Sequence, residues 1–236
     1  MGIRRGSIST PIIADGLVFN MDAANRACYP KTGTVTKNTL NRSQTGSLLN
    51  GVTFESNNEG VFGFDGTSDI IQFQPGDFNF GTNPGSVGIW IYPTSLVSTF
   101  SPLWNLAGYS ANNGFALYSR SNLSRVLHLY KSGNTGNVYS IAPRLNEWNY
   151  VVITKTNSTT AIAYIYNTTD GTLTDTLTSL TGNWGNSSEP TYLGRSTPSS
   201  GDDIDGDIGP FHVYNRALSA NEVLHNYNAL KGRFGL

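Results

Sequence analysis

The sequence is poor in charged residues, and this shortage excludes one class of partner. Only 13% of its 236 residues are Asp, Glu, Lys or Arg, about half the usual share, and the formal net charge is −1. Binding to nucleic acid through a basic field requires a strong excess of Lys and Arg. We therefore expect no nucleic-acid partner. Because few charges keep the surface soluble, we expect the protein to act while bound to another molecule.

Cysteine, long apolar runs and a leader pattern are also lacking. Cys28 is the only cysteine, so no internal disulfide can form. The paired arginines near the N-terminus are not followed by an apolar segment, so we expect no secretion signal. No apolar run approaches the roughly 20 residues of a membrane span, so we expect no membrane partner.

Motifs for catalysis are missing as well. The three histidines and five glutamates are scattered, and the chain has neither a G-x-S-x-G elbow nor an H-E-x-x-H pair. We therefore expect that the protein is not an enzyme.

What the sequence does contain is a series of short apolar runs separated by turns rich in Gly, Asn, Ser and Thr. The turns recur about every 8–12 residues, which is typical of an antiparallel two-sheet sandwich or a barrel. Residues 17–21 alternate as a first strand, and residues 24–51 are predicted to be a long surface excursion. GVFGFDG and DIIQF are predicted to form a hairpin-like pair, and SVGIWIY, apolar on both faces, to be a central strand.

One amphipathic helix, over 219–231, is predicted at the C-terminal end of the sequence. Ser219 and Glu222 have the spacing of a capping box, and Gly232 is expected to end the helix in a left-handed conformation. Its expected apolar face consists of Ala220, Val223, Leu224, Tyr227 and Leu230.

The order of these segments resembles a known family. FDGTSD, SVGIWIYP, EWNYVVITK, AIAYIYN, YLGRS and IGPFHVYNRALSANEV are together similar to the laminin G/concanavalin A-like jelly-roll superfamily, over residues 16–230. The resemblance implies an all-β, two-sheet antiparallel jelly roll spanning 16–236, preceded by an N-terminal arm of residues 1–15. It also implies that the helix covers the end that strand closure leaves open. Hydrolases of this superfamily carry an E-x-D-x-E strand, which is absent here.

Aspartates gather in the segment SGDDIDGDIG, and two interpretations of them stay open. Family members often have an acidic pair where this chain has Gly209 and Pro210, so that site is not carried over. The aspartates either form a solvated turn, in which case no cofactor binds, or ligate Ca²⁺. The candidate calcium ligands are Asp202, Asp203 and Asp205, with Asp65 and Asp69 from FDGTSD.

Three aromatic residues near predicted turns are candidates for glycan binding. Trp184, Tyr109 and Trp104 could stack on the apolar faces of sugar rings. The alternative is that each of them has a structural role. Trp90 and Trp148 lie in strong strand patterns and are expected in the core.

The family resemblance also leads to a hypothesis of function. Chains with a tail like NYNALKGRFGL resemble structural proteins of tailed bacteriophages, including those of cyanobacteria. The resemblance implies a virion component assembled in the host cytoplasm: a capsid decoration, neck or tail fibre protein that also binds host glycans. The partner would be another virion protein or a second copy of the chain. The alternative is a stand-alone lectin-like, carbohydrate-binding module.

The N-terminal arm is expected to make the attachment. Arg4 and Arg5 are predicted to pair with carboxylates of the partner, and Ile12 and Ile13 to fill a groove on it. Removal of residues 1–14 should then leave the thermal stability nearly unchanged.

Overall fold

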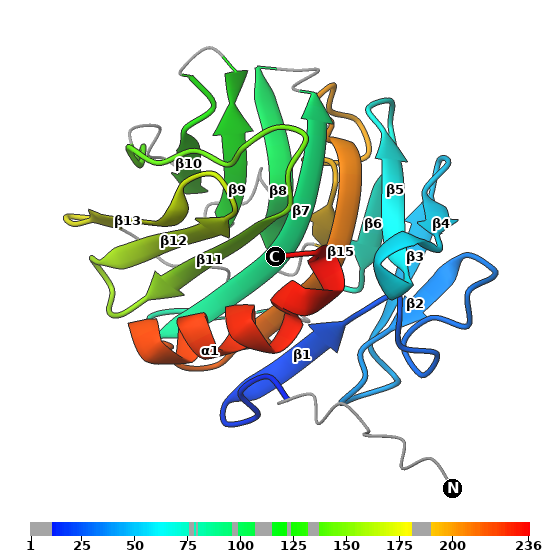
Figure 1. The fold of residues 1–236 in the computed structure, drawn as a ribbon, viewed down its shortest axis with the longest axis horizontal. Coiled ribbons are helices and arrows are strands. Elements are labelled where there is room, and N and C mark those ends of the chain that lie inside the picture. Colours follow the sequence, from blue (N-terminus) through cyan, green and yellow to red (C-terminus); the bar gives the residue numbers. More distant parts are fainter. Residues whose placement is uncertain are drawn as a thin grey trace, which may run out of the picture.

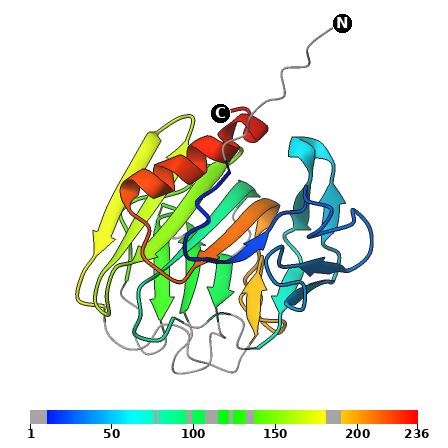
Figure 2. The same cartoon turned by 90° about the horizontal axis from the view of Figure 1, so that it is seen from below.

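The computed structural model describes residues 11–75, 78, 80–95, 99–106, 115–121, 124–131, 137–180 and 190–236. Two antiparallel sheets pack face to face, with one helix on the outside of one sheet (Figures 1 and 2). This confirms the predicted all-β jelly-roll sandwich with a C-terminal helix.

The larger sheet has eight strands, in the order β13-β12-β11-β7-β15-β5-β4, with β1 paired to β15 as well. Residues 205–208 of β15 pair with β5, and residues 211–214 pair with β1, on either side of a bulge. The strands are β1 (Leu17–Met21), β4 (Thr53–Glu55), β5 (Val61–Asp65), β7 (Gly85–Ser95), β11 (Asn149–Lys155), β12 (Ala161–Asn167), β13 (Gly171–Leu177) and β15 (Asp205–Tyr214).

The second sheet has seven strands, in the order β10-β9-β8-β14-β6-β3-β2. Residues 24–51, predicted to be a surface excursion, contribute two strands to its edge. The strands are β2 (Val35–Lys37), β3 (Thr45–Leu49), β6 (Ile70–Phe73), β8 (Phe100–Leu106), β9 (Phe115–Arg120), β10 (Leu127–Lys131) and β14 (Thr191–Leu193).

The predicted hairpin of GVFGFDG and DIIQF is wrong, because β5 and β6 belong to different sheets. Phe62 and Phe64 of β5 enter the space between the sheets from one side, and Ile71 and Phe73 of β6 enter it from the other. The alternating pattern is therefore satisfied by a crossing between the two layers rather than by a hairpin.

Strand β7 is central, as predicted, and it is buried on both faces. Val87, Ile89 and Ile91 face the core between the sheets, while Trp90 faces outward into a second apolar cluster. There the Trp90 ring stacks on Phe234, with ring centroids 4.3 Å apart. The expectation that Trp148 is buried is also confirmed.

Helix α1 (Ala220–Leu230) covers this second cluster on the outer face of the eight-stranded sheet, rather than an open end of the sandwich (Figures 1 and 2). The capping box of Ser219 and Glu222 is confirmed. Gly232 does not end the helix, since the chain continues as the 3-10 helix η3 (Lys231–Phe234) up to a left-handed Gly235. A further 3-10 helix, η1 (Asn57–Glu59), follows β4. Among the described residues no helix is long and apolar enough to cross a membrane.

The described part of the N-terminal arm is bound to the helix. The backbone N–H of Ile13 donates to Oδ1 of Asn226 at 2.8 Å, and the hydroxyl of Tyr214 donates to the Ile13 carbonyl at 3.0 Å. The Ile13 side chain packs on the second cluster, while Ile12 is half-buried. This contact uses part of the Ile13 side chain within the fold, and binding of a partner by Ile12 and Ile13 stays a prediction. Arg4 and Arg5 lie outside the described residues.

Candidate functional site

A pocket lined by carboxylates lies on the outer face of the eight-stranded sheet, where β4, β5, β15 and the end of β7 lie side by side. Its volume is about 340 Å³, within the range of small-ligand sites. Residues at alternate positions of a strand share one face, so Asp205 and Asp207 point the same way. Helix α1 crosses a different part of this sheet (Figure 1). The lining residues are Gly51, Thr53, Glu55, Gly63, Phe64, Asp65, Asp69, Thr94, Asp205, Gly206 and Asp207.

Four of these carboxylates are each oriented by one hydrogen bond from the protein. The donors are Oγ1 of Thr53 to Glu55 (2.7 Å), the N–H of Thr67 to Asp65 (2.8 Å), Oγ of Ser95 to Asp205 (2.6 Å) and Nδ2 of Asn57 to Asp207 (3.3 Å). Each bond uses one carboxylate oxygen. Within the described part of the chain, the second oxygen of each has no hydrogen-bond donor. These oxygens are free to accept hydrogen bonds from a ligand.

Asp69 adds a fifth carboxylate at the base of the pocket. Its side chain is only 3% exposed. Its Oδ2 accepts the backbone N–H of Asp65 at 2.9 Å, while its Oδ1 has no partner among the described residues and faces Gly51, which also lines the pocket. A buried acceptor without a donor costs free energy, so a donor supplied by a ligand would be favourable here.

The crowding of like charges also affects protonation in the pocket. Asp65 and Asp205 are directly opposite each other on neighbouring strands. Burial raises the pKa of Asp69 above its usual value, and the charges of Asp65 and Asp203 raise it further. Burial likewise raises the pKa of Asp207, as does the charge of Glu55. No Lys or Arg is among the lining residues. The pocket therefore favours ligands that donate hydrogen bonds over ligands that are anionic.

The predicted calcium ligands do not all meet in this pocket. Asp65, Asp69 and Asp205 line it, whereas Asp203 forms an ion pair with Arg195 at 3.5 Å and Asp202 accepts a hydrogen bond from Ser196. Across the described ranges, no group of three His, Cys, Asp or Glu residues is placed to hold a metal ion. Calcium needs six to eight oxygen ligands at one point. Calcium binding by these aspartates, as the alternative to a solvated turn, stays a prediction.

Comparison with known families identifies the superfamily to which this fold belongs. The family model described as the concanavalin A-like lectin/glucanases superfamily matches residues 65–224. The chain belongs to this superfamily. A comparison with curated protein sequences gave no match.

Solved structures of this superfamily fold include carbohydrate-active proteins. Domain 4 of AbnA, an extracellular arabinanase of Geobacillus stearothermophilus solved with arabinotriose, has a TM-score of 0.63 at 13% identity, with 90% of this chain and 98% of that domain covered. Trypanosoma rangeli sialidase has a TM-score of 0.65 at 16% identity, with 96% of this chain and 36% of the sialidase covered. The binding domain of Paraclostridial Mosquitocidal Protein 1 has a TM-score of 0.65 at 16% identity, with 91% and 52% covered. The low identities show a shared fold only.

Of the three aromatic residues predicted to bind glycan, only Trp104 lies in the described part of the chain. Trp104 is completely buried in the core between the sheets, so it cannot stack on a sugar. Its position next to a bulge in β8 turns it inward, which the sequence did not reveal. Tyr109 and Trp184 lie outside the described residues.

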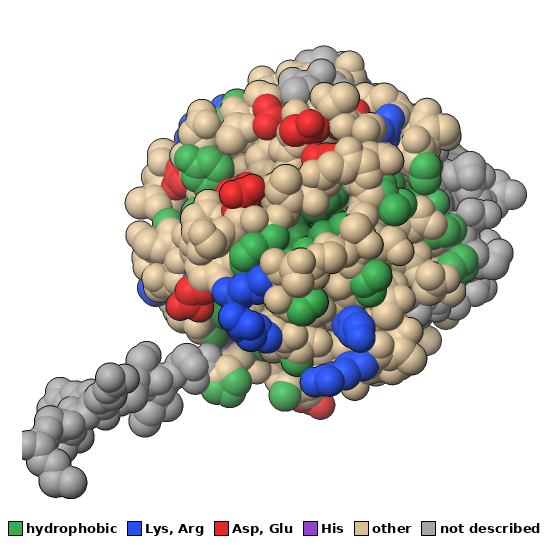
Figure 3. All heavy atoms as spheres, turned by 90° about the vertical axis from the view of Figure 1, so that its right-hand side faces the viewer, with side chains coloured by type: hydrophobic (Ala, Val, Ile, Leu, Met, Phe, Trp, Pro, Cys, Tyr) green, Lys and Arg blue, Asp and Glu red, His purple; other side chains and the backbone are tan. Residues whose placement is uncertain are grey.

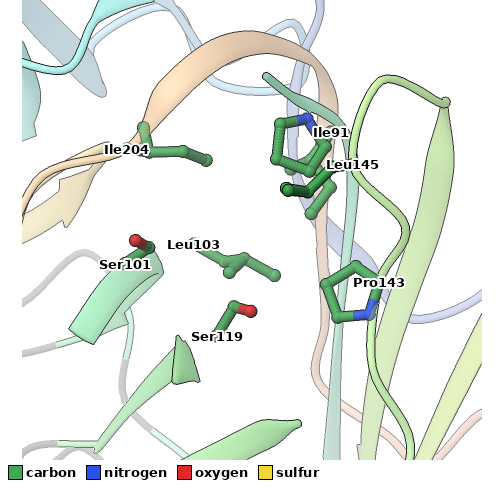
Figure 4. A pocket seen from close by; sticks show the side chains of 8 residues that line it. Ile91, Ser101, Leu103, Ser119, Pro143, Leu145 and Ile204 are labelled. Atoms are coloured by element: carbon green, nitrogen blue, oxygen red, sulfur yellow. The ribbon is translucent and has the colours of Figure 1, made fainter. Parts of the chain in front are cut away.

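A second cavity, between the two sheets of the superfamily fold, is too small for a sugar. It lies among side chains of both sheets and of the segment before β11 (Figure 4), and its free volume of about 10 Å³ is roughly what one water molecule needs. Its lining residues are Ile91, Pro93, Ser101, Leu103, Ser119, Pro143, Leu145 and Ile204. We regard it as a packing defect of the core.

The sequence did not indicate Glu55 or Thr94 as site residues, whereas Asp207 belongs to the aspartate-rich segment considered for calcium. The spacing of Asp205 and Asp207 was a usable signal, because residues two apart in a strand share a face. Glu55 and Thr94 gave none, since only the pairing of β4, β5, β15 and β7 brings them to this pocket.

Proposed function

We propose that the protein binds a neutral oligosaccharide in the carboxylate-lined pocket and does not hydrolyse it. The observation that carries this proposal is the group of four carboxylates that are each fixed by one hydrogen bond and keep one oxygen free. Sugar hydroxyls are donors, and hydrogen bonds to a charged acceptor are stronger than neutral ones.

The spread of the carboxylates favours a sugar over a cation. An ion needs its ligands at one point, whereas an oligosaccharide presents hydroxyls along its length. The arabinotriose complex of the AbnA domain adds support, as a solved neighbour of the same fold that is described with a neutral oligosaccharide.

Binding without hydrolysis is proposed because the chain lacks the E-x-D-x-E strand of hydrolases with this fold. Glycoside hydrolysis needs one carboxyl group as acid and another as base or nucleophile, on either side of the scissile bond. Here Glu55, Asp65, Asp205 and Asp207 all project from one face of a single sheet.

The proposal is tested by screening neutral oligosaccharides, arabinotriose included, by isothermal titration calorimetry. Asp207→Asn should weaken binding about tenfold, because a charged acceptor becomes a weaker one. Glu59→Gln, which removes an exposed carboxylate outside the pocket, is the matched control and should change the affinity less than twofold. Chromatography should recover the oligosaccharide intact after prolonged incubation. Cleaved products would contradict the absence of hydrolysis. Equal affinities of wild type and Asp207→Asn would show that the oligosaccharide does not bind in this pocket.

A role in a phage virion stays a second proposal, which rests on the sequence resemblance. Its support is the pair Arg4 and Arg5 in a sequence otherwise low in charge. A mixing experiment with phage particles tests it. The full chain should be incorporated, and the variant with Arg4→Gln and Arg5→Gln should not. Equal incorporation of both would contradict attachment through these arginines.

A further inference from the structure

A basic pocket, separate from the acidic pocket described above, lies beside the edge strand β2. Its volume is about 540 Å³, and three of its lining residues are the exposed cations Arg26, Lys37 and Arg42. Figure 3 shows the side of the molecule that carries β2, β3 and β4, where most basic side chains gather below most of the acidic ones. The other lining residues are Ala27, Cys28, Pro30, Thr32, Gly33, Thr34 and Val35.

The three cations have no acidic partner among the described residues. Within the described part of the chain, no carboxylate forms an ion pair with Arg26, Lys37 or Arg42, and no Asp or Glu lines the pocket. By contrast, Arg144, Arg195, Arg216 and Arg233 each have an acidic partner. In a chain with a net charge of −1, three cations around one hollow create a local positive field that attracts anions.

The remaining lining residues suit a sugar that carries the negative charge. Thr32 and Thr34 place hydroxyl groups in the same hollow, and the Val35 side chain is 41% exposed and offers an apolar contact. Guanidinium groups bind carboxylates and sulfates with two parallel hydrogen bonds. We propose that this basic pocket binds an anionic polysaccharide through its carboxylate or sulfate groups.

The pocket favours a polysaccharide over nucleic acid. A protein that binds nucleic acid without sequence preference follows the backbone with an extended basic groove, whereas these cations surround one hollow. This inference does not depend on the oligosaccharide proposed for the acidic pocket.

The test measures binding of dextran sulfate, polygalacturonate and uncharged dextran by calorimetry, in low and in physiological salt. Wild type should bind at least one of the two anionic polymers and not dextran, and added salt should weaken the binding. The triple variant Arg26→Gln, Lys37→Gln, Arg42→Gln should lose about tenfold or more in affinity. Because these side chains are exposed, its melting temperature should stay close to that of wild type.

Two control variants separate this site from general charge effects and from the acidic pocket. Lys231→Gln removes one cation of η3, outside the pocket, and should change the affinity less than twofold. The variant with Asp205→Asn and Asp207→Asn should still bind the anionic polymers. Failure to bind either polymer, or undiminished binding by the triple variant, would overturn the proposal. Binding of duplex DNA as tight as that of the polysaccharides would overturn the choice of ligand.

Discussion

At the scale of single residues, His212 shows how burial changes the response of the protein to pH. It lies in β15, is 1% exposed, and its Nδ1 shares a hydrogen bond of 3.0 Å with Oδ1 of Asn20. Burial, followed by the positive charge of Arg233, lowers the pKa of His212 to about 3. In the unfolded chain this pKa is near 6.5. Between these two values only the unfolded chain binds the proton, so stability falls as the pH falls.

His212→Gln should remove this part of the pH dependence. One proton taken up only by the unfolded chain changes the free energy of unfolding by about 1.4 kcal/mol per pH unit. We therefore expect the wild-type free energy, from urea unfolding between pH 4.5 and 6, to have a steeper slope than that of the variant by about this amount. Equal slopes for the two proteins would show that His212 is protonated in the folded state.

Residue patterns predicted some of the site and not the rest. Asp65, Asp69 and Asp205 were singled out from the sequence and do line one pocket. Their role depends on which carboxylate oxygens the protein already uses. For Asp65 this is decided by the N–H of Thr67, two residues along the chain, but for Asp205 it is decided by Ser95, which only the fold places beside it.

At the scale of elements, the helix at the C-terminal end was predicted correctly in position and N-terminal capping, but not in its C-terminal stop or its orientation. A helix with Val223 and Leu224 adjacent can bury one of them or both, depending on its rotation about its own axis. In the structure the Val223 side chain is completely buried between the helix and the sheet, while Leu224 is 41% exposed. The expectation that Leu224 is buried was therefore wrong.

This orientation leads to a paired prediction for the helix. Val223→Ala should lower the free energy of unfolding by about 1–3 kcal/mol, because it leaves a cavity. Leu224→Ala should change it by no more than about 0.5 kcal/mol, as is usual for an exposed position. Chemical denaturation of the two variants checks this, and a larger loss for Leu224→Ala would contradict the observed helix orientation.

Ile13 is hydrogen-bonded to helix α1 and to strand β15, contrary to the expected independence of residues 1–14. Asn226 is completely buried, and its side-chain oxygen accepts the N–H of Ile13, while Tyr214 donates to the Ile13 carbonyl. Removal of residues 11–14 would leave both groups without these partners.

We therefore expect that removal of residues 1–14 destabilises the protein more than removal of residues 1–10 does. An unsatisfied buried polar group costs about 1–3 kcal/mol, so the two melting temperatures should differ by roughly 5 °C. Differential scanning calorimetry of the two truncated proteins measures this difference. Equal melting temperatures would show that the contacts of Ile13 contribute nothing.

At the scale of the whole molecule, the sandwich could be predicted from strand spacing, but its surface sites could not. The order of alternating runs and turns fixes an all-β fold, since each run has to bury one face. It does not reveal that residues 61–65 and 70–73 join different sheets, because either pairing buries the same side chains. The acidic pocket collects residues from segments whose proximity depends on that choice, whereas the basic pocket is lined by residues 26–42 of one continuous segment.

The central claim, that a neutral oligosaccharide binds in the carboxylate-lined pocket, is tested most directly by NMR. The best ligand from the screen is titrated into ¹⁵N-labelled protein, and glycine amides report its position. We expect the signals of Gly51, Gly63 and Gly206, which line the acidic pocket, to move in proportion to saturation. The signals of Gly33, in the basic pocket, and of Gly232, in η3, should not move. Saturable binding that leaves Gly51, Gly63 and Gly206 unchanged would contradict the account.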